Sequence, residues 1–214
     1  MTLFLEPYNY YFLKEQTHIL AQTHRSVNDR ATIQAVRAQI FEAINERFSG
    51  LGADEQAIIL TIEKITDSQR DVDQYLEMLR AHIIPFKQPS ETVVKKAFPK
   101  TKKIQMPDWE TLNLADYSFY AWNDPGQQSK FMLYYQNEKL QGLQGTLSND
   151  VKKGICTICH GTGGVSLFTV KGKVNKDGQY KIKGNYICYN SETCNQQLQT
   201  KEHFTTFVEL VKRK

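Results

Sequence analysis

Cys156-Thr157-Ile158-Cys159 and Cys188-Tyr189-Asn190-Ser191-Glu192-Thr193-Cys194 hold all four cysteines of this 214-residue chain. A Cys-x-x-Cys turn presents two sulfurs with little strain, and four thiolates at tetrahedral corners are a preferred ligand set of zinc. The spacing therefore predicts one structural Zn²⁺ ion, held by Cys156, Cys159, Cys188 and Cys194.

The order of elements around these cysteines resembles a treble-clef zinc finger: a turn with two ligands, a β-hairpin, then two ligands around a helix start near Cys194. Few aliphatic residues after residue 150 are available to form a core. A structural zinc contributes on the order of 10 kcal/mol of folding free energy, enough to hold such a module together.

Other interpretations of the cysteines are weaker. A redox-active Cys156/Cys159 pair would follow a strand in a βαβ unit, which the sequence does not suggest, and it would leave the second pair unexplained. Buried free thiols would not need this pairing. His160 could compete as a ligand, but its side chain diverges from that of Cys159. Four thiolates also leave no open position for a catalytic water.

Composition is that of an ordinary globular protein, with 40% hydrophobic and 23% charged residues. No run of apolar residues is long enough to span a membrane, and Met1 to Phe12 lacks the pattern of an export signal. We therefore expect a cytoplasmic protein, in which disulfides are unfavourable.

Residues 1–84 hold 8 Lys and Arg against 12 Asp and Glu, whereas residues 85–214 hold 19 against 11. The second half is either drawn to an acidic partner or carries a solubilising lysine face.

Several patterns change near residue 85, which predicts an α+β protein with a domain boundary there. Residues 1–84 show helical spacing of apolar residues and predict an all-helical bundle with four helices, the second behind an Asn28 cap. Residues 85–107 contain four of the six prolines and predict a basic linker with a short helix at 90–98. Residues 108–214 predict a β-rich zinc domain.

Within the second domain the hydrophobic period falls towards two. Runs at 117–122, 130–135 and 140–147 predict a β-meander. A hairpin is expected from 165–174 and 180–188 around Lys176-Asp177-Gly178. Helical character returns from about Cys194 to Lys212. Gly161 to Gly164 is expected to form a loop at the tip of the finger.

Enzyme signatures such as a phosphate-binding glycine loop, a nucleophile elbow or a His-Glu-x-x-His helix do not occur in the sequence. The sequence therefore predicts a binding protein and no enzyme.

Together these features resemble the FusB-type family of elongation factor G-binding proteins over essentially the whole length. The motifs that carry this resemblance are Val27-Asn28-Asp29, Lys102-Lys103-Ile104, Trp122-Asn123, Leu147-Ser148-Asn149, Lys153-Gly154-Ile155-Cys156-Thr157-Ile158-Cys159, Val165-Ser166-Leu167-Phe168, Asp177-Gly178-Gln179-Tyr180 and Tyr186-Ile187-Cys188.

The resemblance implies a helical bundle followed by a treble-clef-like zinc domain. It also implies binding of elongation factor G, the ribosomal translocase, with only indirect contact to the ribosome and no small-molecule substrate. Family members that give fusidic acid resistance protect the target: they bind the factor and promote its release from the ribosome, without altering the drug.

By position, the resemblance implies partner contacts at Ile155, Lys183, Tyr186 and Phe207. Aromatic anchors and a steering lysine on a zinc-stiffened platform are typical of interfaces. Ile155 stands where an aromatic residue is expected. Phe207 reads equally as a core residue of the last helix, and the side of the strand that Tyr186 occupies is left open.

A rival hypothesis is a zinc-containing protein that binds ribosomal RNA. In that case lysines of the predicted hairpin would hold phosphates, and binding would depend steeply on salt. These lysines are Lys171, Lys173, Lys176, Lys181 and Lys183.

Overall fold

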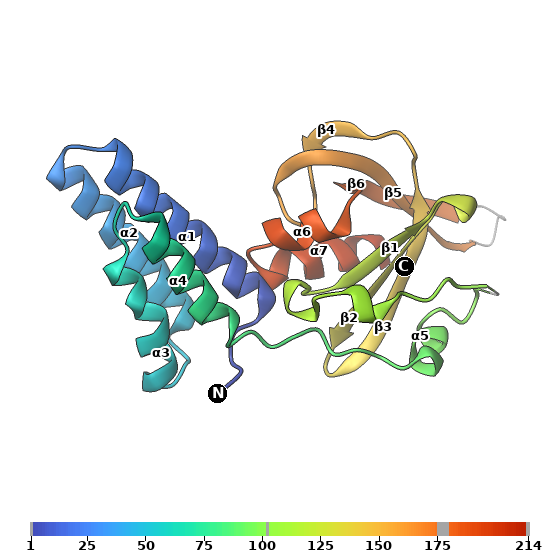
Figure 1. The fold of residues 1–214 in the computed structure, drawn as a ribbon. Helices are drawn as coiled ribbons and strands as arrows, with labels where there is room; N and C mark the ends of the chain where they lie inside the picture. Colours follow the sequence, from blue (N-terminus) through green and yellow to red (C-terminus); the bar gives the residue numbers. More distant parts are fainter. Residues whose placement is uncertain (1, 102, 175–179, 213–214) are drawn as a thin grey trace. The chain divides into compact units, whose positions relative to one another are not determined.

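A computed structural model describes residues 2–101, 103–174 and 180–212, with the backbone alone at 173, 174 and 180 (Figure 1). The chain forms two compact units, Met1–Ile84 and Pro85–Lys214, which are described separately. Lys102 of the predicted linker and the predicted hairpin turn at Lys176-Asp177-Gly178, with Gln179, lie outside the described residues.

The first unit consists of four α-helices and a short 3₁₀ turn, which confirms the all-helical prediction. They are α1 (Pro7–Ser26), α2 (Arg30–Phe48), α3 (Ala53–Leu60) with the 3₁₀ turn η1 (Thr61–Lys64), and α4 (Gln69–Arg80). The cap of α2 is Asp29 and not Asn28, since the Asp29 carboxylate accepts a 2.9 Å hydrogen bond from the Thr32 amide.

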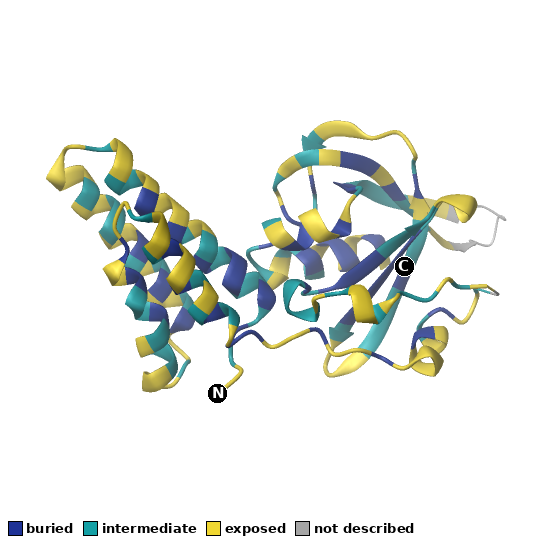
Figure 2. Ribbon diagram, viewed as in Figure 1, coloured by how far each residue is buried: buried dark blue, intermediate teal, exposed yellow. Residues whose placement is uncertain are grey.

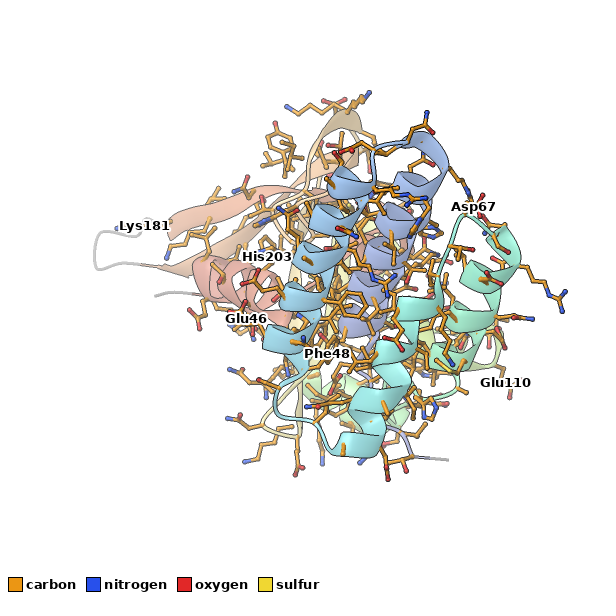
Figure 3. The ribbon with its side chains drawn as sticks, turned by 90° about the vertical axis from the view of Figure 1, so that its left-hand side faces the viewer. Glu46, Phe48, Asp67, Glu110, Lys181 and His203 are labelled. Atoms are coloured by element: carbon orange, nitrogen blue, oxygen red, sulfur yellow. The ribbon has the colours of Figure 1, made fainter. Side chains whose placement is uncertain are left out.

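The core of this unit lies where α1 contacts α2 and α4. In Figure 2 the buried residues of these helices face one another and the exposed residues face outward. Leu13 and Leu20 of α1, Ile44 of α2 and Leu79 of α4 are almost completely buried. Arg25 at the end of α1 donates a 2.8 Å hydrogen bond to the Asp67 carbonyl, at the end of the bundle where α1 turns into α2 (Figure 3). A bridge between Leu5 and Ile83 brings both ends of the unit together.

The second unit is built on one antiparallel sheet, with β1 (Tyr120–Asp124), β2 (Ser129–Gln136), β3 (Lys139–Leu147), β4 (Lys152–Ile155), β5 (Thr162–Val174) and β6 (Tyr180–Cys188). The strand order is β1-β2-β3-β5-β4, and β6 also pairs with β5. The predicted meander and hairpin are confirmed. Residues 162–164 pair with β4, so the loop expected at Gly161 to Gly164 is largely a strand.

Helices cover part of one sheet face. The predicted terminal helix is two helices, α6 (Ser191–Gln197) and α7 (Lys201–Lys212), around which the sheet curves in Figure 1. Phe204 of α7 stacks on Phe119 with centroids 4.4 Å apart and meets Tyr134 of β2 edge-on at 5.2 Å. Aromatic rings therefore join these helices to the first strands of the sheet.

The segment expected as a linker packs on the other face of the sheet. Its helix α5 (Glu91–Ala97) lies so close to β3 that a Cβ at Gly142 would stand 2.5 Å from the Ala97 carbonyl oxygen. Phe98, which follows α5, meets Phe131 of β2 edge-on at 5.2 Å. The prolines around this segment thus shape a chain that covers the sheet, and residues 85–107 belong to the compact second unit.

None of the described helices is long and apolar enough to cross a membrane.

Neighbouring valines of α5 test whether the segment stabilises the second unit. Val94 is fully buried, whereas Val93 is 40% exposed. We expect Val94→Ala to lower the free energy of unfolding by about 2 kcal/mol, because it removes buried methyl groups and leaves a cavity. Val93→Ala is the matched control and should change it by less than about 0.5 kcal/mol. Urea unfolding of the full chain measures both; equal effects would show that α5 does not pack as described.

Candidate metal centre and the surface around it

The first two cysteines lie in a tight turn directly after β4. The Cys156 amide donates to the Gly161 carbonyl at 3.0 Å, and the His160 amide donates back to the Cys156 carbonyl at 2.9 Å. His160 has a left-handed backbone, with φ 59°, which closes the turn. Together these bonds direct the side chains of Cys156 and Cys159 to the same side of the turn.

The other two cysteines come from the end of β6 and from α6. Cys188 is the last residue of β6 and pairs with Val165 of β5. Cys194 lies within α6, whose N-terminus is capped by Asn190 through a 3.0 Å hydrogen bond from the Thr193 amide. The sheet positions Cys188, and the capped helix positions Cys194.

All four sulfurs converge and are buried, and they lie within 4.8 Å of one another. The Cys156 and Cys194 sulfurs are 3.8 Å apart, and those of Cys159 and Cys188 are 3.7 Å apart. Sulfurs at tetrahedral corners about 2.3 Å from a zinc ion would be about 3.8 Å apart. The donor set and its spacing fit one structural Zn²⁺, as predicted.

Hydrogen bonding prepares these thiols for a cation. The backbone amides of Ile158 and Cys188 donate to the Cys156 sulfur at 3.3 and 3.2 Å. Hydrogen bonds from the Cys159, Cys188 and Cys194 side chains lower the pKa of Cys156, while the bond with Cys156 raises the pKa of Cys194. The amide donors and the neighbouring thiols thus favour the thiolate form of Cys156, which is the form that binds zinc.

His160 is not part of the cluster, which among the described residues contains cysteines alone. Its ring stacks on that of His203 from α7, with centroids 3.7 Å apart. The sequence prediction that His160 points away from the metal centre agrees with this placement.

Asn195, next to the last ligand, ties the metal centre to the segment that leads into β1. Its side chain is fully buried. The carbonyl oxygen accepts from the Ser118 amide at 2.8 Å and the Phe119 amide at 3.3 Å, and the amide nitrogen donates to the Phe119 and Ser191 carbonyls, both at 2.9 Å. All the hydrogen-bonding capacity of the side chain is used, so it fixes α6 against the sheet. Sequence reasoning missed this residue, and its only signal is its position beside Cys194.

Two family models cover nearly the whole chain. One, described as the N-terminal part of elongation factor G-binding protein, matches residues 4–87, and the other, the FBP C-terminal treble-clef zinc-finger, matches residues 92–209. The chain belongs to the elongation factor G-binding protein family.

A solved structure extends this assignment. The structure of the fusidic acid resistance protein FusC is similar to this chain with a TM-score of 0.87 and 30% sequence identity, and the match covers 97% of each chain. A comparison with curated proteins found no match. The zinc-finger match agrees with the cysteine cluster, since both place a structural zinc site in the second unit.

Two of the residues implied as partner contacts lie near the metal centre. Ile155 precedes the first ligand and is 67% exposed. The amide and hydroxyl of Thr157 both donate to the Tyr186 carbonyl, at 2.9 and 3.0 Å, which holds β6 against this turn. Lys152 lies 3.8 Å from the centre of the half-buried Tyr186 ring. Ile155 and the Tyr186 backbone therefore both adjoin the turn that carries the first two cysteines, although the two side chains occupy opposite faces of the sheet, since Ile155 pairs with Thr162 and Tyr186 with Leu167.

The other two implied contacts lie elsewhere. Directly paired residues share a sheet face, so Tyr186, opposite Leu167, and Lys183, opposite Val170, occupy opposite faces of the β5–β6 pair. Phe207 is 1% exposed, with its ring 5.9 Å from that of Phe168. Phe207 is therefore a core residue that packs against the sheet, which is the second of the two roles that the sequence left open.

The lysines of the RNA-binding alternative are also divided. Lys183 and Lys171 occupy opposite faces of the β5–β6 pair, since Lys171 pairs with Ile182. The side chains of Lys173 and Lys176 are outside the part of the chain that the structure describes. The described lysines of this hairpin thus do not form a single phosphate-binding face.

Replacing one ligand should abolish metal binding. We expect Cys156→Ser to leave the protein without stoichiometric zinc and to unfold the second unit, because three thiolates no longer close the metal shell. The helical unit should keep its structure, since residues 1–84 form a compact unit of their own. Metal analysis and circular dichroism measure both effects. His160→Ala, beside a ligand, is the control and should retain one zinc; zinc retention in the serine variant would exclude this site.

Asn195→Ala should destabilise the zinc-loaded protein by about 2–3 kcal/mol, because it leaves buried backbone groups at Ser118 and Phe119 without partners. Gln196→Ala, a change at the exposed neighbouring residue, provides the comparison and should have little effect. Urea unfolding in the presence of zinc measures the difference. Similar stabilities of the two variants would contradict the role of Asn195 in fixing α6 against the sheet.

Proposed function

We propose that this protein binds elongation factor G and promotes its release from the ribosome, so that translation continues in the presence of fusidic acid. Family membership over both units, together with the full-length similarity to the fusidic acid resistance protein FusC, carries this proposal. The likeness covers the helical unit as well as the zinc unit, which favours a shared function of the whole chain.

Protection by binding requires a preference for one state of the factor. A protein that bound the ribosome-held and the free conformations equally would leave their ratio unchanged. We therefore infer that it contacts a conformation of elongation factor G that holds the ribosome weakly. A tenfold change in the ratio requires a difference in binding free energy of about 1.4 kcal/mol.

Binding without catalysis is the second part of the proposal. Four converging sulfurs offer a closed ligand set, in which zinc has no open position for water or substrate. The zinc ion would supply rigidity, and the chain's own residues would make the contacts.

The surface beside the metal centre is the proposed docking site. Ile155 is the most exposed of the large hydrophobic residues described as exposed, and it directly precedes the turn that carries Cys156 and Cys159. An exposed aliphatic side chain next to a rigid turn suits the centre of an interface, because ordering it on binding costs little conformational entropy.

Purified protein mixed with elongation factor G provides the main test. We expect a one-to-one complex in size-exclusion chromatography, and faster dissociation of the factor from ribosomes stalled with fusidic acid and GDP. The drug should be recovered unchanged. Absence of a complex, or salt-sensitive binding to bare ribosomal RNA in its place, would contradict the proposal.

The docking site is tested by a charge at Ile155. We expect Ile155→Asp to weaken the complex at least tenfold, because a carboxylate would be desolvated at an apolar contact. Ile19→Asp is the matched control, since Ile19 is a 40% exposed isoleucine of α1 in the helical unit. Isothermal titration calorimetry with elongation factor G compares them, and an unchanged affinity of the Ile155 variant would move the interface elsewhere.

A further inference from the structure

Lys130 of β2 is a buried cation beside the metal centre. Only 2% of the residue is exposed, although lysine is rarely buried to this extent. It lies opposite Asn123 of β1 in the sheet. Its ammonium donates to the Asn123 side-chain oxygen at 2.8 Å and to the Tyr189 carbonyl at 2.9 Å, while the Asn123 amide donates to the same carbonyl at 3.2 Å.

The carbonyl that Lys130 reaches follows a metal ligand directly. Tyr189 comes after Cys188, and its amide donates to the Gly164 carbonyl at 3.0 Å. The lysine side chain thus extends from the sheet to the base of the cysteine cluster. Among the described residues, no other side chain of β2 forms a hydrogen bond with Tyr189.

A buried ammonium normally has a carboxylate partner. No carboxylate forms an ion pair with Lys130 within residues 2–101, 103–174 and 180–212. Burial lowers the pKa of Lys130 to about 8, and the groups that oppose this effect are Cys194, Cys188 and Cys156. Lys130 and the cysteine cluster are thus close enough for their charges to interact.

The charge of the loaded centre explains this arrangement. Four thiolates around one Zn²⁺ leave a net charge of about −2 in a buried site. Such a charge is unfavourable in a medium of low dielectric constant unless a positive group lies near it. A neutral side chain at residue 130 could fill the same volume but could not offset this charge.

We propose that Lys130 is the counter-charge of the zinc centre: its buried ammonium offsets the negative charge of the four thiolates, tightens zinc binding and slows zinc release. This role concerns the metal centre itself and does not depend on the identity of the partner protein. Lys130 is a positioning and charge-balancing residue and not a ligand.

Two neutral substitutions in the full-length protein test the charge. Lys130→Met keeps the length of the side chain, and Lys130→Gln keeps a hydrogen-bond donor. We expect each to lower zinc affinity about tenfold or more, the range found when groups around metal ligands are changed. Competition with a chromophoric chelator measures the affinity, and the rate of zinc transfer to excess chelator measures release.

Asn123→Ala is the matched control. It removes the neutral partner of the same ammonium and one bond to the Tyr189 carbonyl, but it leaves the charge in place. We expect its zinc affinity to change by less than threefold. An equal loss in Asn123→Ala, or wild-type affinity in Lys130→Gln, would overturn the proposal, since hydrogen bonding or packing would then account for the role of the lysine.

A measurement on the wild-type protein covers the case in which neither lysine variant folds. The nitrogen chemical shift of the Lys130 side chain distinguishes ammonium from amine in the zinc-loaded protein. We expect an ammonium at pH 7, and a neutral amine there would overturn the proposal.

Discussion

Convergence of four sulfurs from three separate elements is the constraint on which the second unit depends. A turn after β4, the end of β6 and the helix α6 each bring cysteines to within 4.8 Å of one another. Buried thiolates would repel one another without a cation, so a metal ion turns an unfavourable cluster into a link between these elements. Asn195 of α6 then bonds to Phe119, just before β1, and Lys130 of β2 bonds to Tyr189, between β6 and α6. The metal centre thereby determines where the sheet, the helices and the exposed Ile155 stand.

Sequence patterns predicted the parts of this fold that rest on local chemistry. Cysteine spacing identified the metal ligands, and helical periodicity identified the bundle. Features set by tertiary contacts were missed. Segment 85–107 reads as a linker because it is basic and contains four of the six prolines, yet its residues Phe86, Val94 and Phe98 enter the core. The short strand β4 contains two lysines and a glycine, and forms because β5 pairs with it. The α2 cap was predicted at Asn28 and is Asp29 in the structure. Both residue types are good caps, and only the backbone geometry distinguishes them.

The partner contacts illustrate a different limit of sequence reasoning. Spacing along β6 indicates that Lys183 and Tyr186 point in opposite directions, but it does not say which side is covered. The structure places Tyr186 beside the turn that carries Cys156 and Cys159, and buries Phe207 under Phe168. A family pattern transferred by position thus includes both a surface residue and a residue that supports the surface from within. In the proposed complex, elongation factor G would contact the exposed Ile155 beside the metal ligands, and Phe207 would act only through the core.

Strand β5 pairs with three other strands of the sheet. Its first residues pair with β4, its middle with β3, and most of its length with β6. One continuous backbone therefore runs from the cysteine-bearing turn to the sheet that α5 covers. A force applied at the turn would act along the length of this strand, where several backbone hydrogen bonds to β3, β4 and β6 would have to break together. The turn and the sheet would consequently resist being pulled apart.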